Sequence, residues 1–269
     1  MKTRTGKGTS AASLALLLLF LAGGCVSEES PTAPAAEAPT LPDTSYFSFD
    51  YNFFNSPSKD AIEASQLNFL NAAIRVAVIK TVTDIVITPP VAAFALALHT
   101  VPTRQPDGSW LWVYTHVYGT REAQIRLRGE PEGGGALWEL RITALHLGLD
   151  NELWFEGETR SWGQEGFWQF YDFNKPGDPM VARIDWEHTL TSKYVSFTDL
   201  YTNPDDRISY REDGQDRSID FSDASEGEEW FIRWDTETGA GSLMVSDYNN
   251  GEEACWDSDR NDIDCTPAL

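Results

Sequence analysis

The residues best suited to chemistry lie near the C-terminus, between Cys255 and Cys265. Four residues of this loop carry a carboxylate or amide oxygen at nearly alternating positions: Asp257, Asp259, Asn261 and Asp264. Hard oxygen ligands on a turning loop suit Ca²⁺, so these four residues are predicted to form a weak calcium site. The EF-hand pattern is not met, because its sixth position is Asp262 instead of Gly and its twelfth is Ala268 instead of Glu. The alternative is a solvated acidic loop that a disulfide closes.

A second residue with a chemical role is Cys25, which follows a segment typical of a secretory signal peptide. Three basic residues precede an apolar run over residues 14–22, and this run is too short to span a bilayer as a helix. Residues 21–25, Leu-Ala-Gly-Gly-Cys, resemble the bacterial lipobox, although Ala22 stands where that pattern usually has Leu. The resemblance implies cleavage after residue 24 and a lipid on Cys25. The alternative is an ordinary secreted protein with a free Cys25.

The cysteine count favours the lipid anchor. The chain has three cysteines, an odd number that is awkward for an exported protein. If Cys25 carries lipid, Cys255 and Cys265 remain as a pair ten positions apart, and a disulfide between them is expected outside the cytosol.

Residues 25–43 are predicted to form a disordered tether. They contain four prolines and few large apolar side chains, a composition that favours an extended chain without a core. The acidic pair Glu28-Glu29 resembles the surface-export signal of Bacteroidota lipoproteins, and residue 26 is not the Asp that retains proteobacterial lipoproteins at the inner membrane. The expected location is therefore the outer membrane, facing the periplasm or the surface, with the protein held by its lipid anchor.

Charge narrows the possible partners. The formal net charge of the chain is −22, which repels nucleic acid and anionic membrane faces. We therefore expect no nucleic-acid partner, and we attribute the charge mainly to solubility.

The remaining residues, 44–269, are predicted to form one domain that begins with an aromatic strand or extended segment and a helix at about 58–86. Ser58 or Asp60 can cap this helix. From Leu67 to Val82 nearly all residues are apolar, and the polar exceptions Asn68, Asn71 and Arg75 form one thin stripe. A helix of this kind is expected to be buried on most sides, with the face of Leu70, Ile74 and Val78 against a sheet. Pro89-Pro90 is expected to end the helical region, and a brief second helix can follow within residues 91–98.

From Ser109 onward the pattern is that of strands and turns. Alternating apolar and polar residues recur in about eleven short runs, which glycine-, proline- and asparagine-rich turns separate every 10 to 17 residues. Short links favour neighbouring antiparallel strands, so the prediction is a mainly β meander. Because such a meander curls, we expect a strongly curved or incompletely closed barrel around the apolar helix. A β-sandwich with an edge helix is the alternative.

Other residue types give weaker signals. The four histidines, His99, His116, His146 and His188, are too far apart in sequence to suggest a metal pair. No nucleophile elbow or phosphate-binding glycine loop is present. The ten tryptophans are interpreted mainly as core and sheet packing, with stacking on a sugar or contact with an apolar ligand as the alternative.

Two segments carry a resemblance. Residues 153–157, Leu-Trp-Phe-Glu-Gly, and residues 166–172, Gly-Phe-Trp-Gln-Phe-Tyr-Asp, resemble pieces of bacterial lipoproteins with a Trp-rich antiparallel β domain. This resemblance implies a location and a fold but no activity. The expected architecture is also similar to that of the Lol-type lipoprotein carriers, which are open barrels around an apolar cavity.

These features predict a cell-envelope lipoprotein that acts as a non-enzymatic binding or carrier module with an apolar pocket. Its expected partners are the membrane, through the lipid anchor, and a hydrophobic or carbohydrate ligand. A surface structural or adhesion lipoprotein without a small ligand is the second hypothesis, and a carbohydrate-active enzyme is the third.

Overall fold

The computed structural model describes residues 37–54 and 65–265. The predicted signal peptide, Cys25, most of the predicted tether and the predicted helix caps Ser58 and Asp60 lie outside these ranges. Residues Ala38–Leu269 belong to one compact unit.

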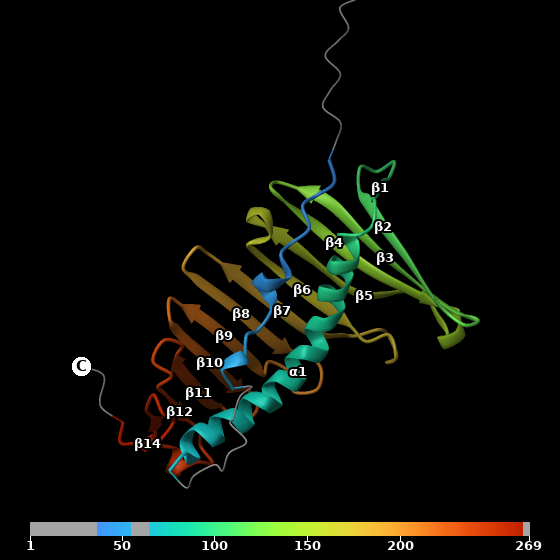
Figure 1. Ribbon diagram of the computed structural model, residues 1–269. Coiled ribbons are helices and arrows are strands. Elements are labelled where there is room, and N and C mark those ends of the chain that lie inside the picture. Colours follow the sequence, from blue (N-terminus) through green and yellow to red (C-terminus); the bar gives the residue numbers. More distant parts are fainter. Residues whose placement is uncertain (1–36, 55–64, 266–269) are drawn as a thin grey trace, which may run out of the picture. The chain divides into compact units, whose positions relative to one another are not determined.

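One antiparallel sheet dominates this unit. Its 14 strands follow one another in chain order from β1 to β14, so every strand pairs with its neighbours in sequence, and the sheet does not close on itself (Figure 1). The predicted mainly β, incompletely closed meander is therefore confirmed, and the sandwich is not formed. The strands are β1 (Thr103–Arg104), β2 (Trp110–Tyr118), β3 (Arg121–Glu132), β4 (Gly135–Ala144), β5 (Leu149–Arg160), β6 (Glu165–Tyr171), β7 (Met180–His188), β8 (Ser192–Asp199), β9 (Arg207–Asp213), β10 (Asp216–Asp223), β11 (Glu228–Asp235), β12 (Gly241–Met244), β13 (Ala254–Trp256) and β14 (Asp262–Ile263).

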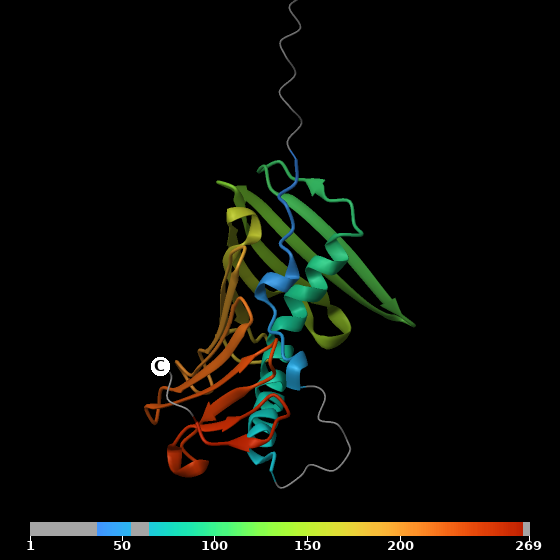
Figure 2. The same cartoon turned by 60° about the vertical axis from the view of Figure 1, so that its left-hand side comes forward.

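The sheet curves around a single long helix, α1 (Leu67–Ala97), which crosses the strands on the concave side (Figures 1 and 2). The helix contacts β12, β13 and β14 near one edge of the sheet and β3 near the other. Five short 3-10 turns complete the described structure: η1 (Thr44–Phe47), η2 (Asn52–Phe54), η3 (Leu145–Leu147), η4 (Ser161–Gly163) and η5 (Asn249–Gly251).

The expectation that Pro89-Pro90 ends the helix is wrong. The helix continues through both prolines to Ala97, so residues 91–97 are its last two turns and not a second helix. Each proline lacks the N–H that would bond to the carbonyl four residues earlier. Packing offsets this loss, because Phe94 is buried with its ring 5.1 Å from that of Trp138 and 5.3 Å from that of Trp168. Tertiary contacts rather than local preference thus set the end of α1.

Residues 44–54 form no strand. They form η1, an extended link and η2, and they lie in the concave face beside α1. Phe47, Tyr51 and Phe54 are buried, and the alternate aromatics Phe49 and Phe53 also pack against the core. Of the two alternatives predicted for this segment, the strand is wrong, and an extended segment that packs against the core is present.

Packing against the core also begins before the predicted end of the tether at residue 43. Residues 38–42 were predicted to belong to the tether, yet Ala38 and Leu41 pack against the core and Pro42 is buried. Pro39 lies against Gly129, where a Cβ atom would come within 3.1 Å of it. The prolines here support packing of an extended segment on the sheet.

Inward-facing strand residues complete the core. Buried positions alternate along β4 to β7 and along β9, because successive side chains of a strand point to opposite faces. Aromatic rings form a continuous path from Trp112 to Trp138, then through Phe94 of α1 to Trp168 and Trp186. Side chains of the sheet, of α1 and of residues 44–54 therefore occupy the concave face.

Candidate functional site

The outer side of α1 is the most unusual surface of the described structure. Ten residues of the helix are buried, among them Phe69, Val76, Ile79 and Phe94, and they occupy the side that faces the sheet. The opposite side carries large apolar residues that solvent reaches. We call these the α1 outer face: Ile74, Val78, Val82, Ile85 and Leu96.

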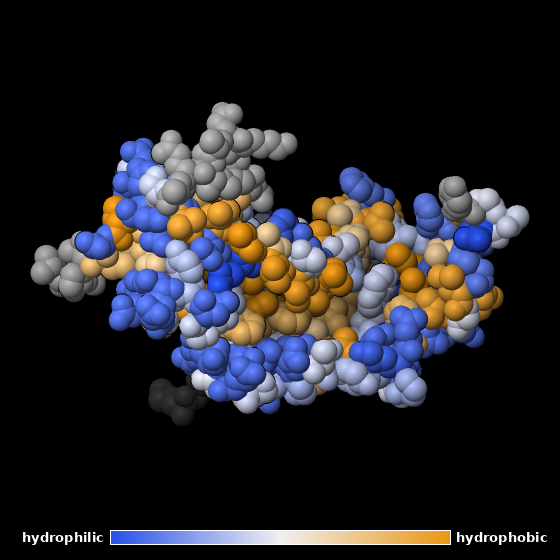
Figure 3. Space-filling view, turned by 90° about the horizontal axis from the view of Figure 1, so that it is seen from below, coloured by the Kyte–Doolittle hydropathy of each residue, from blue (hydrophilic) through white to orange (hydrophobic). Residues whose placement is uncertain are grey.

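These five side chains are between 40% and 70% exposed. They recur every three or four residues up to Ile85, so they form one stripe, which extends for about 33 Å from Ile74 to Leu96 at 1.5 Å per residue. Figure 3 shows apolar side chains gathered across the middle of the molecule as seen from below, with polar side chains around them. A stripe of this length is more than the scattered apolar residues that ordinary surfaces carry.

This result corrects the predicted burial of α1. The helix is buried on one side only, and Ile74 and Val78 point away from the sheet instead of into it. By length and composition α1 would also be able to cross a membrane, but only a third of its most apolar 18-residue window is buried within the structure. Its buried side belongs to the protein core, so α1 is a core helix with a second, exposed apolar side.

The polar stripe of α1 has partners within the protein. Asn68 donates to the carbonyl oxygen of Cys255 at 2.7 Å and accepts from the hydroxyl of Tyr248 at 2.6 Å. Arg75 forms an ion pair with Asp247. The stripe therefore faces β13 and the segment that precedes it, and it does not mark the solvent side of the helix.

The C-terminal loop is closed as predicted. Cys255 and Cys265 form a disulfide with Cα atoms 5.3 Å apart. Inside the loop, a carboxylate oxygen of Asp257 accepts the backbone N–H groups of Asp259 and Asn261, both at 2.9 Å. Asp257 thus stabilises the turn itself.

Another residue of the loop holds the helix. The carboxylate of Asp262 accepts the backbone N–H groups of Leu67 and Asn68 at 3.1 and 2.9 Å. These are amides of the first turn, which has no intrahelical partner and no side-chain cap from Gln66. A negative charge at this end also interacts favourably with the helix dipole. The predicted caps Ser58 and Asp60 lie outside the described residues. Asp262 caps the helical turn that begins at Leu67.

The four predicted calcium ligands are not gathered into a binding cluster. Asp259 and Asp264 are exposed, whereas Asp257 and Asn261 are partly buried in the turn. Within residues 37–54 and 65–265, no group of three His, Cys, Asp or Glu residues is placed to hold a metal ion. The arrangement shows a helix-capping loop, and calcium binding by it stays a prediction.

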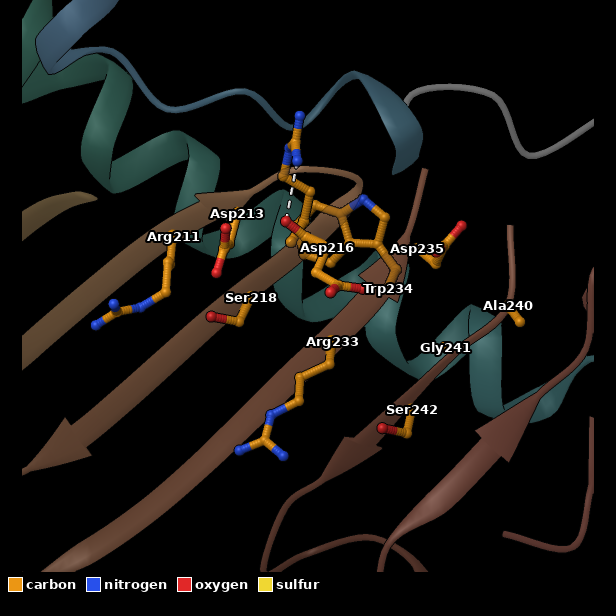
Figure 4. Close-up of a pocket in the computed structure, with 11 residues that line it drawn as sticks. Arg211, Asp213, Asp216, Ser218, Arg233, Trp234, Asp235, Ala240, Gly241 and Ser242 are labelled. Carbon is orange, nitrogen blue, oxygen red and sulfur yellow. Dashed lines mark hydrogen bonds between the residues drawn. The ribbon is translucent and has the colours of Figure 1, made fainter. Parts of the chain in front are cut away.

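A hollow of about 470 Å³ lies on the sheet face opposite α1, over β9 to β12 (Figure 4). Arg211, Ser218 and Arg233 stand opposite one another across three strands. Two residues further along each strand, Asp213, Asp216 and Asp235 form a parallel row. Charged and hydroxyl-bearing side chains of this kind suit a polar ligand such as a sugar. Trp234 and Ala240 add apolar surface to the same hollow.

Several carboxylates have a lowered pKa because turns bind them. A hydrogen bond from the Ser109 hydroxyl and another from its backbone N–H lower the pKa of Asp107 to about 2. The pKa of Asp235 is lowered chiefly by the backbone N–H of Thr238, and that of Asp223 by the hydroxyl of Ser225. A general acid of a glycosidase needs a raised pKa, so these three groups are suited to closing turns and not to that chemistry.

The tryptophans divide into a large core group and one exception. Trp112, Trp138, Trp168, Trp186, Trp234 and Trp256 are buried, as the packing interpretation expects, and Trp110, Trp154 and Trp230 are partly buried. Trp162 differs, because 73% of it is exposed. The exposure of Trp162 could not be predicted from the sequence, because Trp162 lies between strands in a turn with no distinctive motif.

Comparison with known proteins adds no assignment: no family, no curated protein and no solved structure matches this chain.

Proposed function

We propose that this protein is a lipid-anchored protein of the bacterial cell envelope that acts as a non-enzymatic binding module, with the α1 outer face as its contact surface. The observation that carries the proposal is the row of five exposed apolar side chains on α1. Covering half of such a side chain contributes about 1 kcal/mol, so a partner that covers the row gains on the order of 5 kcal/mol. The signal peptide and Cys25 supply the location.

The exported location has support of its own. A disulfide between Cys255 and Cys265 is typical of an oxidising compartment. The lipid is tested by mass analysis of the mature protein, which is expected to begin at Cys25 and to carry acyl chains. A mature chain that begins elsewhere or lacks lipid contradicts the anchor.

The contact surface is tested with the compact unit Ala38–Leu269 and N-phenyl-1-naphthylamine, an apolar dye that fluoresces when it leaves water. We expect Val78→Asn combined with Ile85→Asn to weaken dye binding at least tenfold. Leu147→Asn is the matched control, because Leu147 is equally apolar and 66% exposed but lies on η3, away from α1. Equal binding by all three proteins contradicts the proposal.

A second candidate is a structural or adhesion lipoprotein without a small ligand. The filled concave face favours it, because the core side chains of α1 and of residues 44–54 take the space that an internal ligand would need. A lipidated protein that binds no apolar dye would support this candidate over the first.

Weak calcium binding by Asp257, Asp259, Asn261 and Asp264 is a subsidiary proposal. Calorimetry at millimolar calcium, with Asp259→Ala as the comparison, tests it. Absence of heat and an unchanged melting temperature would leave the loop with its capping role alone.

A further inference from the structure

One end of the strands forms a continuous rim. Here the turn that connects β5 and β6 is joined to its neighbours on both sides: the N–H of Trp162 bonds to the carbonyl of Gly134 at 2.9 Å, and the N–H of His188 bonds to that of Gln164 at 2.8 Å. We call the turns at residues 133–134, 161–164 and 188–191 the tether rim. The hydrogen bonds between successive turns hold their tips in a fixed arrangement.

Two large apolar side chains project from the tether rim. Trp162 is 73% exposed and Leu190 is fully exposed. Trp162 also has a φ of 61°, in the left-handed region that bulky residues rarely adopt. A strained backbone that directs an indole into solvent persists only where the surroundings impose it, and here the bond to Gly134 does so. Such an arrangement indicates a role of Trp162 outside the core.

The N-terminal segment runs along the same rim. Pro42 lies against Gly163, where a Cβ atom would come within 3.1 Å of it, and the backbone oxygen of Ser45 accepts a hydrogen bond from Lys193. In Figure 1 the first described residues, in blue, lie at this end of the strands. Glu37 is twelve residues after Cys25 in the sequence. Twelve residues reach at most about 40 Å, so a lipid on Cys25 keeps this part of the protein close to the bilayer.

We propose that the tether rim is the part of the protein that rests on the lipid surface, with the side chains of Trp162 and Leu190 in the interfacial layer. This inference rests on the proposed anchor at Cys25. An indole ring prefers the boundary between headgroups and acyl chains, and a leucine side chain gains by leaving water there. Together with a lipid anchor, the inserted side chains of Trp162 and Leu190 fix the orientation of the domain as well as its location. Because the chain is strongly acidic, the expected surface is a zwitterionic bilayer rather than an anionic one.

The experiment uses the lipidated protein in phosphatidylcholine vesicles. A cysteine introduced at Leu190→Cys is labelled with an environment-sensitive fluorophore, since lipid occupies Cys25 and the disulfide occupies the other two thiols. The matched control is Leu147→Cys, another exposed leucine in a turn, placed at the opposite end of the strands. With brominated lipid in the vesicles, we expect at least threefold quenching of the label at 190 and no significant quenching of the label at 147.

Flotation of the vesicles distinguishes the lipid anchor at Cys25 from the contact of the tether rim with the bilayer. A protein that floats while its label at 190 is not quenched, or is quenched no more than the label at 147, overturns the rim contact and leaves the anchor standing. A protein that does not float overturns the anchor, and the rim contact with it. Trp162→Ser is expected to reduce quenching at 190 at least twofold without changing flotation, because the lipid on Cys25 still holds the protein. Unchanged quenching in this variant overturns the role of Trp162.

Discussion

At the scale of single residues, Glu212 shows how this acidic chain uses a carboxylate inside its fold. One oxygen lies 2.6 Å from the ammonium group of Lys193 and the other lies 3.3 Å from the guanidinium group of Arg217. All three side chains are mostly buried. Burial acts to raise the pKa of Glu212, but the hydrogen bond from Lys193 and the two positive charges outweigh it, so the pKa is lowered.

This shift predicts a dependence of stability on pH. Because the pKa of Glu212 is lower in the folded protein, its contribution is complete above its unfolded pKa of about 4.3 and is lost as the pH falls through the folded value. We expect Glu212→Gln to reduce the free energy of unfolding by about 1–2 kcal/mol at pH 7, and by clearly less near pH 3. Urea unfolding at both pH values measures the difference.

The control for Glu212 is Asp84→Asn. Asp84 also pairs with a lysine, Lys80, at 2.6 Å, but both side chains are about half exposed. An exposed pair of this kind contributes little, so this variant is expected to change stability by less than about 0.5 kcal/mol. Equal effects of the two substitutions would show that burial does not distinguish the pairs.

At the scale of elements, α1 has two apolar sides with different roles. Val76 is 2% exposed and belongs to the core, whereas Ile74, two positions away, is 55% exposed. Val76→Asp is therefore expected to destabilise the protein by more than about 3 kcal/mol, because an unpaired charge would enter the core. Ile74→Asp is expected to cost less than about 1 kcal/mol. Thermal unfolding of the two variants tests the assignment, and a larger loss from Ile74→Asp would reverse it.

The capping of α1 by a distant residue gives a second prediction at this scale. Asp262→Ala removes the acceptor of the Leu67 and Asn68 amides. Loss of a helix cap costs about 1 kcal/mol, so the melting temperature is expected to fall by a few degrees. Asp264→Ala is the control, because Asp264 lies in the same disulfide loop but is exposed. An equal fall in both variants would attribute the effect to loop charge instead of capping.

Sequence patterns were sufficient for some elements and not for others. The strands from β2 to β12 follow local alternation and turn residues, which a single sequence displays. Local patterns do not show which side of α1 packs against the sheet, because a helix that is apolar almost all round has no side distinguished by its sequence. Asn68 and Arg75 belong to the thin polar stripe, and their partners are Cys255 and Asp247, about 170 to 190 residues later in the chain. Such pairings, and hence the candidate site, depend on tertiary structure.

The end of α1 illustrates a different limit. Local rules correctly identify Pro89-Pro90 as unfavourable in a helix. They do not include the gain from burying Phe94 among Phe47, Trp138 and Trp168 on the far side of the prolines. Where long-range packing outweighs local preference, a boundary predicted from sequence is misplaced.

At the scale of the whole molecule, the two apolar surfaces occupy different parts of the same unit. The α1 outer face lies on the side of the helix away from the sheet, and the tether rim lies at one end of the strands. If the rim rests on lipid, the hairpin ends that carry Leu147 point away from the bilayer. Anchoring and binding would then use separate surfaces of one domain.

The open sheet also has two unequal edges. On one side the strands shorten to the two residues of β14, whereas on the other side β1 covers only Trp110 and Leu111 of the nine-residue β2. No described strand pairs with the free side of residues 112–118, whose sequence Trp-Val-Tyr-Thr-His-Val-Tyr has neither proline nor a formal charge at pH 7. Uncovered, β-branched and aromatic segments of this kind are the templates on which cross-β aggregates grow. In crowded or concentrated preparations, self-association of this protein is therefore expected to begin at β2, and a lysine at Val113 or Val117 is the change that would suppress it.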